Sequence, residues 1–85
     1  MSKILIADDS EPIRSLYKRV LSINYDVAKV VEDGLQAVEA ISDNEIDVAV
    51  LDVRMPKLDG ISASKLIRSQ SPEIGIVIVS AYDDW

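Results

Sequence analysis

Residues 46–56 of the chain are IDVAVLDVRMP, and this stretch decides the fold. Its apolar run is typical of a strand that is buried on both faces, as in the middle of a parallel sheet. The run ends at Asp52, and Pro56 cannot continue a ladder of hydrogen bonds. Open α/β sheets bind their ligands at the carboxyl ends of the strands, where Asp52 is expected. A lone acid after a strand is more often a loop cap, so Asp52 alone does not establish a site.

A second group of acids accompanies Asp52. Asp8 and Asp9 follow another apolar run, residues 4–7. If the two strands are parallel neighbours, their carboxyl ends lie at the same edge of the sheet. We therefore expect three carboxylates to converge there.

Strand-like and helix-like segments alternate along the whole chain. The expected strands are residues 3–7, 26–31, 46–52 and 75–79, and the expected helices are residues 11–22, 34–42 and 60–69. Such alternation with right-handed crossovers gives a parallel sheet with helices on both faces. Lys29 places the second strand at an edge, so we expect the order 2-1-3-4 in a single domain over residues 1–85.

Hydrophobic spacing also predicts which side chains are buried. The first helix has an amphipathic stripe of residues three and four apart: Ile13, Leu16, Tyr17, Val20 and Leu21. Arg14, Lys18 and Arg19 lie off this stripe and are expected to face water. The second helix is expected to bury a face made of Leu35, Val38 and Ile41 with Ala37, and the third helix has Ile61, Ser64 and Ile67 on one side. Residues 76–79 are expected to form a buried strand.

Composition excludes several classes of function. The net charge of −6 argues against a nucleic-acid surface, which should be basic. The absence of cysteine and histidine excludes thiolate metal sites and makes zinc unfavourable. The apolar runs are far shorter than the ~20 residues of a membrane span, and no signal peptide is recognised. A cytoplasmic protein is expected.

Three neighbouring carboxylates repel one another, so such a cluster persists by holding protons or by binding a cation. Because only oxygen ligands are on offer, Mg²⁺ is expected first, with Mn²⁺ or Ca²⁺ as substitutes. A carboxylate beside such an ion can attack phosphorus and become an aspartyl-phosphate. Ser80, after the last strand, is placed to donate a hydrogen bond to a phosphoryl oxygen, although a serine there is more often a cap.

These residues resemble the receiver domain of two-component response regulators. The family's acidic pair corresponds to Asp8-Asp9, its acceptor aspartate to Asp52 within LDVRMPKLDG (residues 51–60), and its hydroxyl residue to Ser80, followed by Ala81. The likeness runs through essentially all 85 residues. It implies a flavodoxin-like, doubly wound parallel sheet.

The resemblance also implies a site and a partner. Asp8, Asp9 and Asp52 would bind Mg²⁺ together with the main-chain carbonyl of Arg54. Asp52 would accept a phosphoryl group from a sensor histidine kinase. The chain would then be a signalling switch and not an enzyme, beyond its own phosphorylation and dephosphorylation.

Further roles follow from the same resemblance. Ser80 and Ala81 would contact the phosphoryl group and shift to signal its arrival. The side chains of Arg54 and Tyr82 would tune how long the phosphate survives.

The chain departs from the family at its end. Family members continue with a further helix, a strand that begins with a lysine, and a last helix. The lysines of this chain do not match that one; they are Lys3, Lys18, Lys29, Lys57 and Lys65. We therefore expect a truncated (βα)3β fragment without the last helix, strand and helix. Its fourth strand would be an exposed apolar edge, which predicts self-association.

Two other functions compete with a phosphorylation switch. A shortened or engineered scaffold that folds and assembles without phosphotransfer is a serious rival, because the lysine is missing. An aspartate-nucleophile phosphohydrolase is disfavoured, since Arg54 occupies the position of its second acid. A nucleotide-binding domain is also disfavoured, because no glycine-rich phosphate loop follows either strand.

Overall fold

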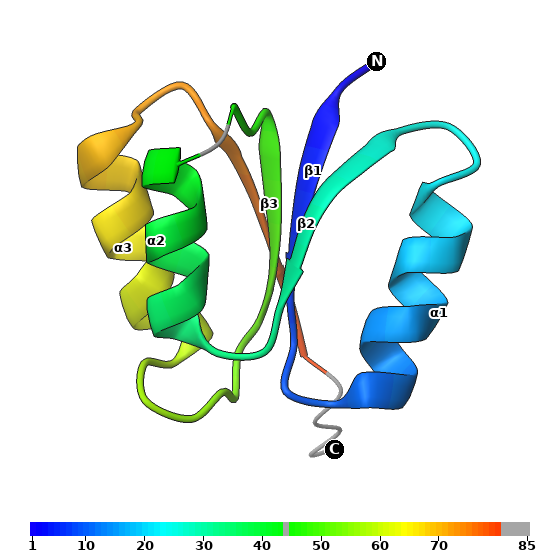
Figure 1. The fold of residues 1–85 in the computed structure, drawn as a ribbon. Helices are drawn as coiled ribbons and strands as arrows, with labels where there is room; N and C mark the ends of the chain where they lie inside the picture. The colour runs from blue at the N-terminus through cyan, green and yellow to red at the C-terminus, as the bar shows by residue number, and fades with distance from the viewer. Residues whose placement is uncertain (44, 81–85) are drawn as a thin grey trace.

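The computed structural model describes residues 1–43 and 45–80. Within these residues a parallel sheet lies between two layers of helices (Figure 1). In chain order the elements are β1 (Lys3–Ala7), α1 (Glu11–Leu21), β2 (Asp26–Val31), α2 (Gly34–Asp43), β3 (Val48–Asp52), α3 (Gly60–Gln70) and β4 (Gly75–Val79). The strand order is β2-β1-β3-β4, which confirms the predicted topology.

Capping residues set several of the element boundaries. Asp59 begins α3 by accepting a hydrogen bond from the Ser62 N–H at 2.8 Å. Pro12 lies in the first turn of α1, where its missing N–H costs nothing. β3 begins at Val48, two residues later than expected. The preceding Asp47 bonds Lys3 with both its N–H and its carboxylate, and its carbonyl accepts from the Gly75 N–H.

The strand register brings three strand ends to one edge of the sheet. Ala7 of β1 pairs with Leu51 of β3, so Asp8 and Asp52 follow neighbouring positions. Asp52 itself pairs with Val79 of β4, and Ser80 comes next. The parallel ladder therefore fixes the position of the candidate site.

The main cluster of buried hydrophobic residues lies on one side of the sheet, beneath α2 and α3, while Ile4 and Ile6 of β1 are buried on the other side. Leu5, Leu51 and Ile67 of the main cluster are completely buried. On the other side α1 lies against β1 and β2, and none of its residues is buried. Burial along β3 consequently alternates, with Ala49 and Leu51 buried and Val50 only half-buried. The apolar run alone predicts burial on both faces, whereas a chain without the last helix is expected to leave one face of this strand uncovered. Within the described residues β3 is fully buried on one face only.

Other burial predictions have mixed outcomes. The apolar run of β4 alone predicts a buried strand, whereas a shortened chain is expected to expose this strand as an apolar edge. Within the described residues β4 lies at the edge of the sheet, with Val77 48% and Ile78 38% exposed, in agreement with the second expectation. Leu35 and Ile61 are also exposed. The helices α2 and α3 pack against each other and the sheet through their buried residues, which are Gly34, Ala37, Ala40, Ile41, Gly60, Ala63 and Ile67. The sequence pattern correctly places Ala37, Ile41 and Ile67 on these faces, but it misses the small residues Gly34, Ala40, Gly60 and Ala63, whose hydropathy signal is weak.

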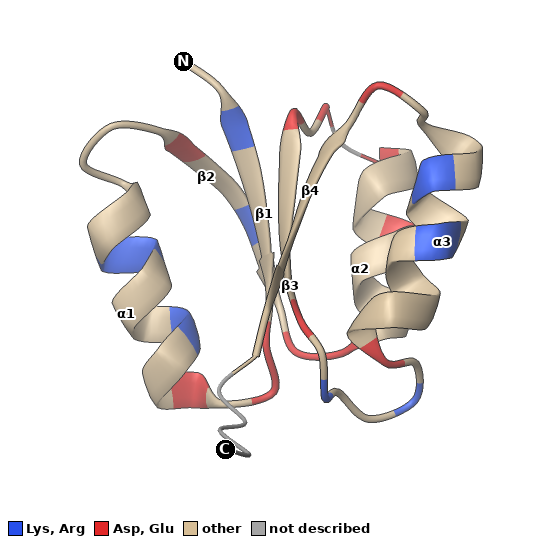
Figure 2. Cartoon of the chain, turned by 180° about the vertical axis from the view of Figure 1, so that it is seen from behind, with Lys and Arg blue, Asp and Glu red and all other residues tan. Residues whose placement is uncertain are grey.

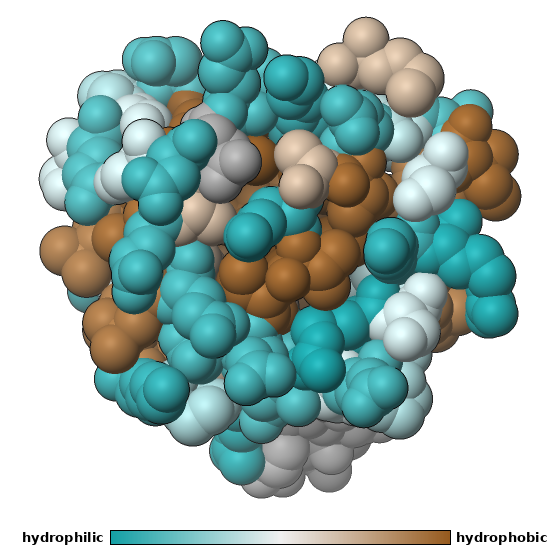
Figure 3. Space-filling view, viewed as in Figure 1, coloured by the Kyte–Doolittle hydropathy of each residue, from teal (hydrophilic) through white to brown (hydrophobic). Residues whose placement is uncertain are grey.

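Apolar surface also reaches solvent between the two helix layers. Figure 3 shows it at the centre of the face on which the β2 edge lies, surrounded by hydrophilic residues. Among the described residues, no helix has the length and apolar character needed to cross a membrane.

Candidate functional site

Asp8, Asp9 and Asp52 meet where β1 and β3 end. Each offers a carboxylate oxygen, and these oxygens all lie within 4.8 Å of one another. Asp8 is buried, Asp52 is half-buried and Asp9 is exposed. Figure 2 shows this concentration of acidic residues at the lower end of the sheet. The structure thus brings together the three acids that the sequence pointed to.

Asp8 is held by three hydrogen bonds. Its N–H donates to the carbonyl of Val31 at 3.2 Å, and its Oδ1 accepts from the Ser10 N–H at 2.9 Å. Its carbonyl accepts from Nη1 of Arg14 at 2.7 Å. The turn after β1 is therefore held by both main-chain and side-chain hydrogen bonds.

Arg14 is the residue that sequence reasoning missed. It was expected to face water, but its side chain is only 18% exposed, and its Nη2 lies 4.0 Å from a carboxylate oxygen of Glu32. The reason is that α1 starts beside the acid cluster, and a long side chain in its first turns reaches back to the end of β1. The sequence did contain a signal for this position of Arg14, because it is a basic residue one turn into a helix that follows an acidic loop.

The electrostatics of Asp52 favour a bound cation. Burial raises the pKa of its carboxyl group above the usual 3.8, and repulsion by Asp8 and then Asp9 raises it further. Main-chain hydrogen bonds from Val53 and Arg54 partly oppose this shift in pKa. A divalent cation among the three carboxylates would remove the repulsion. The donors are all oxygens, so they fit a hard cation such as Mg²⁺.

Two glycines bring the loop after Asp52 against the helices. A Cβ on Gly60 would overlap the carbonyl oxygen of Asp52, and a Cβ on Gly34 would overlap that of Leu58. The Gly60 N–H also donates to the carbonyl of Val53 at 2.9 Å. Close main-chain contact therefore fixes the position of residues 53–59 relative to Asp52.

An ion pair ties the same loop to the start of α2. Lys57 has a positive φ of 69° and places its Nζ 3.7 Å from Oδ2 of the buried Asp33. Asp33 also caps α2, because its Oδ1 accepts from the Gln36 N–H at 2.8 Å. Lys57 is thus paired beside the acid cluster and not within it.

The remaining predicted residues have these positions. Arg54 is exposed and lies two residues after Asp52, in the loop that leaves β3. Ser80 is exposed and directly follows β4, beside the end of β3. Ala81 and Tyr82 lie outside the described residues.

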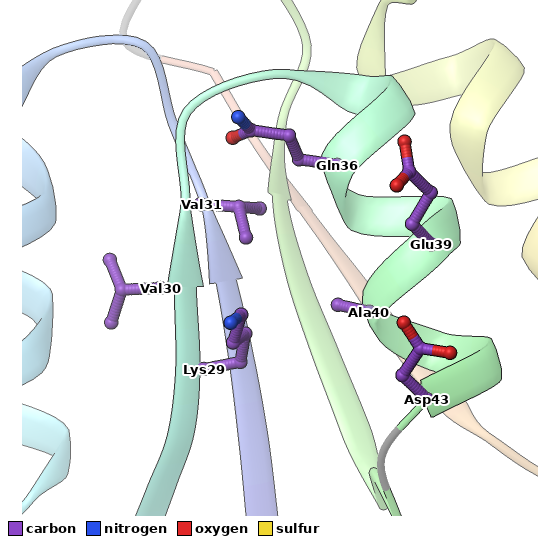
Figure 4. Close-up of a pocket in the computed structure, with 7 residues that line it drawn as sticks. All are labelled: Lys29, Val30, Val31, Gln36, Glu39, Ala40 and Asp43. Carbon is purple, nitrogen blue, oxygen red and sulfur yellow. The ribbon is translucent and has the colours of Figure 1, made fainter.

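A separate polar hollow of about 480 Å³ lies between β2 and α2 (Figure 4). Lys29 lines it from the strand, and Gln36, Glu39 and Asp43 line it from the helix. The side-chain oxygen of Gln36 already accepts a hydrogen bond from the Glu32 N–H at 3.0 Å. None of the three clustered acids lines this hollow, so it is not part of the candidate site.

A family model, the response regulator receiver domain, matches residues 4–85. The chain belongs to this family. The predicted resemblance is therefore confirmed, and with it the flavodoxin-like fold class, since solved receiver domains share the arrangement of strands and helices.

Relatives of this receiver domain include the response regulators MprA of Mycobacterium sp. (strain KMS) and Mycobacterium ulcerans (strain Agy99). Each is 36% identical over 81 residues, which are 95% of this chain and 35% of the relative. The receiver domain thus spans about a third of the length of these curated relatives.

Solved structures give the same result. The response regulator domain of Thermotoga maritima CheB has a TM-score of 0.90 and 34% identity, covering 95% of this chain and 61% of that one. The Francisella response regulator 1452 receiver domain has a TM-score of 0.84 and 38% identity, covering 99% and 69%.

Proposed function

We propose that this receiver domain accepts a phosphoryl group on Asp52 from a sensor histidine kinase, in a transfer that depends on Mg²⁺. One observation carries the proposal: Asp8, Asp9 and Asp52 place their oxygens within 4.8 Å of one another at the carboxyl edge of a receiver fold. Asp8, Asp9, Asp52 and the main-chain carbonyl of Arg54 would hold the cation.

The chemistry assigns one task to Asp52 and another to Asp8 and Asp9 together. An Oδ of ionised Asp52 attacks the phosphorus of the kinase phosphohistidine, the P–N bond breaks, and the imidazole nitrogen that leaves takes up a proton. Asp8 and Asp9 would hold the cation beside the acceptor. When bound, Mg²⁺ would neutralise the charge that develops on the phosphoryl oxygens.

Residues around the acceptor would read out and limit the modification. We assign Ser80 and Ala81 to contact with the phosphoryl group, and the side chains of Arg54 and Tyr82 to its lifetime. Receiver domains are signalling modules, so turnover is expected to be limited to the domain's own phosphorylation and dephosphorylation. The cytoplasm, where histidine kinases phosphorylate such domains, is the proposed location.

Intact mass after incubation with acetyl phosphate tests the proposal. One added phosphoryl group is expected in the presence of Mg²⁺ and none after chelation. Asp52→Asn should remove the added mass, whereas Asp26→Asn, at an exposed acid that begins β2, should keep it. A folded chain that binds Mg²⁺ but gains no mass would contradict phosphotransfer and leave a metal-binding scaffold. Phosphate that persists in Asp52→Asn would contradict the assignment of the acceptor.

A second proposed function, assembly with another copy of the chain, is favoured by β4. This strand lies at the edge of the described sheet and exposes Val77 and Ile78 on its two faces. An apolar edge of this kind pairs readily with another chain. A light-scattering mass equal to one chain at micromolar concentration would contradict self-association.

A further inference from the structure

The turn between β2 and α2 contacts the loops that follow both β1 and β3. On the side of β1, the Val31 carbonyl accepts from the Asp8 N–H at 3.2 Å. The carboxylate of Glu32 lies 4.0 Å from Nη2 of Arg14, whose Nη1 donates to the Asp8 carbonyl at 2.7 Å. On the other side, the loop after β3 passes the start of α2 (Figure 1). This turn, residues 31–33, is therefore a common support for the two loops.

Asp33 makes the contact to the loop after β3. Among the described residues, the buried charged side chains are Asp8 and Asp33, and the proposed phosphotransfer uses only Asp8. The Asp33 side chain is 3% exposed, and its Oδ2 lies 3.7 Å from Nζ of Lys57. Its Oδ1 accepts from the Gln36 N–H at 2.8 Å. A buried carboxylate needs such partners, so Asp33 favours a loop conformation that keeps Lys57 close.

Lys57 meets Asp33 from a main-chain conformation that lysine seldom adopts. Its φ is 69°, and it is the only residue other than glycine with a positive φ in the described part of the chain. The next residue, Leu58, brings its carbonyl oxygen so close to Gly34 that a Cβ there would overlap it. The ion pair and this close contact hold the middle of the loop, and Arg54 lies near its beginning.

We propose that Asp33 and Lys57 are positioning residues for the cation site. Their ion pair sets where the loop after β3 lies relative to the turn that carries Asp8, and hence where the main-chain carbonyl of Arg54 lies relative to the three carboxylates. The inference rests on the proposed cation site and assigns residues that set its affinity. Residues that orient metal ligands without binding the metal change its affinity by about tenfold or more when they are substituted.

Two asparagine variants remove the ion pair with little other change. Asparagine caps helices as well as aspartate does, so Asp33→Asn keeps the hydrogen bond from the Gln36 N–H. Asparagine also tolerates a positive φ better than most residues, so Lys57→Asn suits the loop. Both variants are therefore expected to fold, which circular dichroism checks.

The affinity of the metal-free chain for Mg²⁺, measured by a titration that follows its amide NMR signals, tests the proposal. Asp33→Asn and Lys57→Asn are each expected to raise the Kd for Mg²⁺ by about tenfold. The double variant should bind no more weakly than either single variant, because the pair acts as a unit. Lys57→Arg keeps a cation within reach of Asp33 and should keep the affinity of the parent.

The direction of the Lys57→Asn effect separates positioning from the effect of charge alone. Lys57 is a cation beside the acid cluster, so the loss of its charge alone would strengthen the binding of Mg²⁺, whereas the loss of the Asp33 charge would weaken it. Positioning predicts weaker binding for both variants. Glu39→Gln on α2 and Lys65→Asn on α3 are the matched controls, since they remove the same charges at exposed positions. Both should bind Mg²⁺ like the parent at about 0.15 M salt.

The outcomes distinguish this inference from the proposed function. Stronger binding of Mg²⁺ by Lys57→Asn, or an affinity like that of the parent in both asparagine variants, would overturn the positioning role and leave the cation site standing. A parent chain that binds no Mg²⁺ would overturn the cation site itself, and with it both the positioning role and the proposed phosphotransfer.

Discussion

The two faces of the sheet differ in how they are stabilised. Under α2 and α3, residues such as Ala49, Leu51 and Ile67 are fully buried in one continuous core. Under α1, Val50 and Val77 remain partly exposed, and the helix itself buries no residue. The same strands contribute alternate side chains to both faces, so the difference comes from the helices and not from the sheet.

This difference indicates how the molecule divides its tasks. The covered face fixes the backbone on which Asp52 and its loop rest, since the loop is held against α2 and α3. On the other, open face, Val77 is 48% exposed. Truncations on the covered face should therefore lower the free energy of unfolding more than truncations on the open face.

The largest expected effect is that of Gly60→Ala on the covered face. A Cβ at this position would overlap the Asp52 carbonyl oxygen, which belongs to the main chain and cannot move aside. We expect a loss of about 3 kcal/mol or more in the free energy of unfolding, measured with urea. Gly75→Ala is the matched control, because its nearest atom would be a methyl group of Val48 at 3.4 Å. A Gly60→Ala variant as stable as Gly75→Ala would contradict the close contact.

The next largest expected effect is the difference between Ile67→Ala and Val20→Ala in the free energy of unfolding that each loses. Ile67 is completely buried on α3, so its truncation should cost about 2–5 kcal/mol, independent of protein concentration. Val20 is half exposed, so its truncation should cost under about 1 kcal/mol in dilute protein. Thermal unfolding at two protein concentrations measures both. An equal loss for the two variants in dilute protein would mean that the faces are equally packed.

Much of this architecture could be predicted from the sequence, because strong local signals carried it. Runs such as residues 4–7 and 48–51 identify strands, and the acids that end them identify the site. What the sequence could not supply was which face of each strand is covered. The apolar runs of β3 and β4 indicate a capacity for burial on both faces, and only tertiary packing decides whether helices meet it.

The small side chains and the long polar ones were the other sources of error. Ala63 and Gly60 are buried because close helix packing requires them to be small, a property that hydropathy does not register. Arg14 combines a charge with a long flexible stem, so its helical position alone does not reveal where its guanidinium lies. The acid cluster was predictable, whereas the residue that supports it was not.

Arg14 ties the open face to the site, and its removal should have an intermediate effect. Arg14→Gln loses the hydrogen bond to the Asp8 carbonyl, and we expect a cost of about 1–2 kcal/mol in the free energy of unfolding. Arg19→Gln, at an exposed position of the same helix, should cost under about 0.5 kcal/mol. Chemical denaturation of both variants gives the comparison. Equal stability of the two would show that Arg14 does not anchor the turn after β1.

The smallest expected effect is a dependence of stability on pH that comes from Asp52. Its pKa is raised in the folded state, so the ionised carboxylate destabilises the metal-free fold, and this cost appears as pH rises from 3.8 through the folded pKa. Without Mg²⁺, Asp52→Asn should therefore melt a few degrees above the parent at pH 7, and the two should converge in acid.

A second carboxylate provides a control of opposite sign. Hydrogen bonds from Ser62 hold the pKa of Asp59 below its usual value, so its ionised form stabilises the fold at neutral pH, and Asp59→Asn should melt below the parent there.

Adding Mg²⁺ should raise the melting temperature of the parent more than that of Asp52→Asn, because the cation removes the repulsion among the acids. If Mg²⁺ raised the melting temperatures of the parent and of Asp52→Asn equally, the cation would bind elsewhere. The repulsion that raises the pKa of Asp52 would then destabilise the fold without serving a metal site.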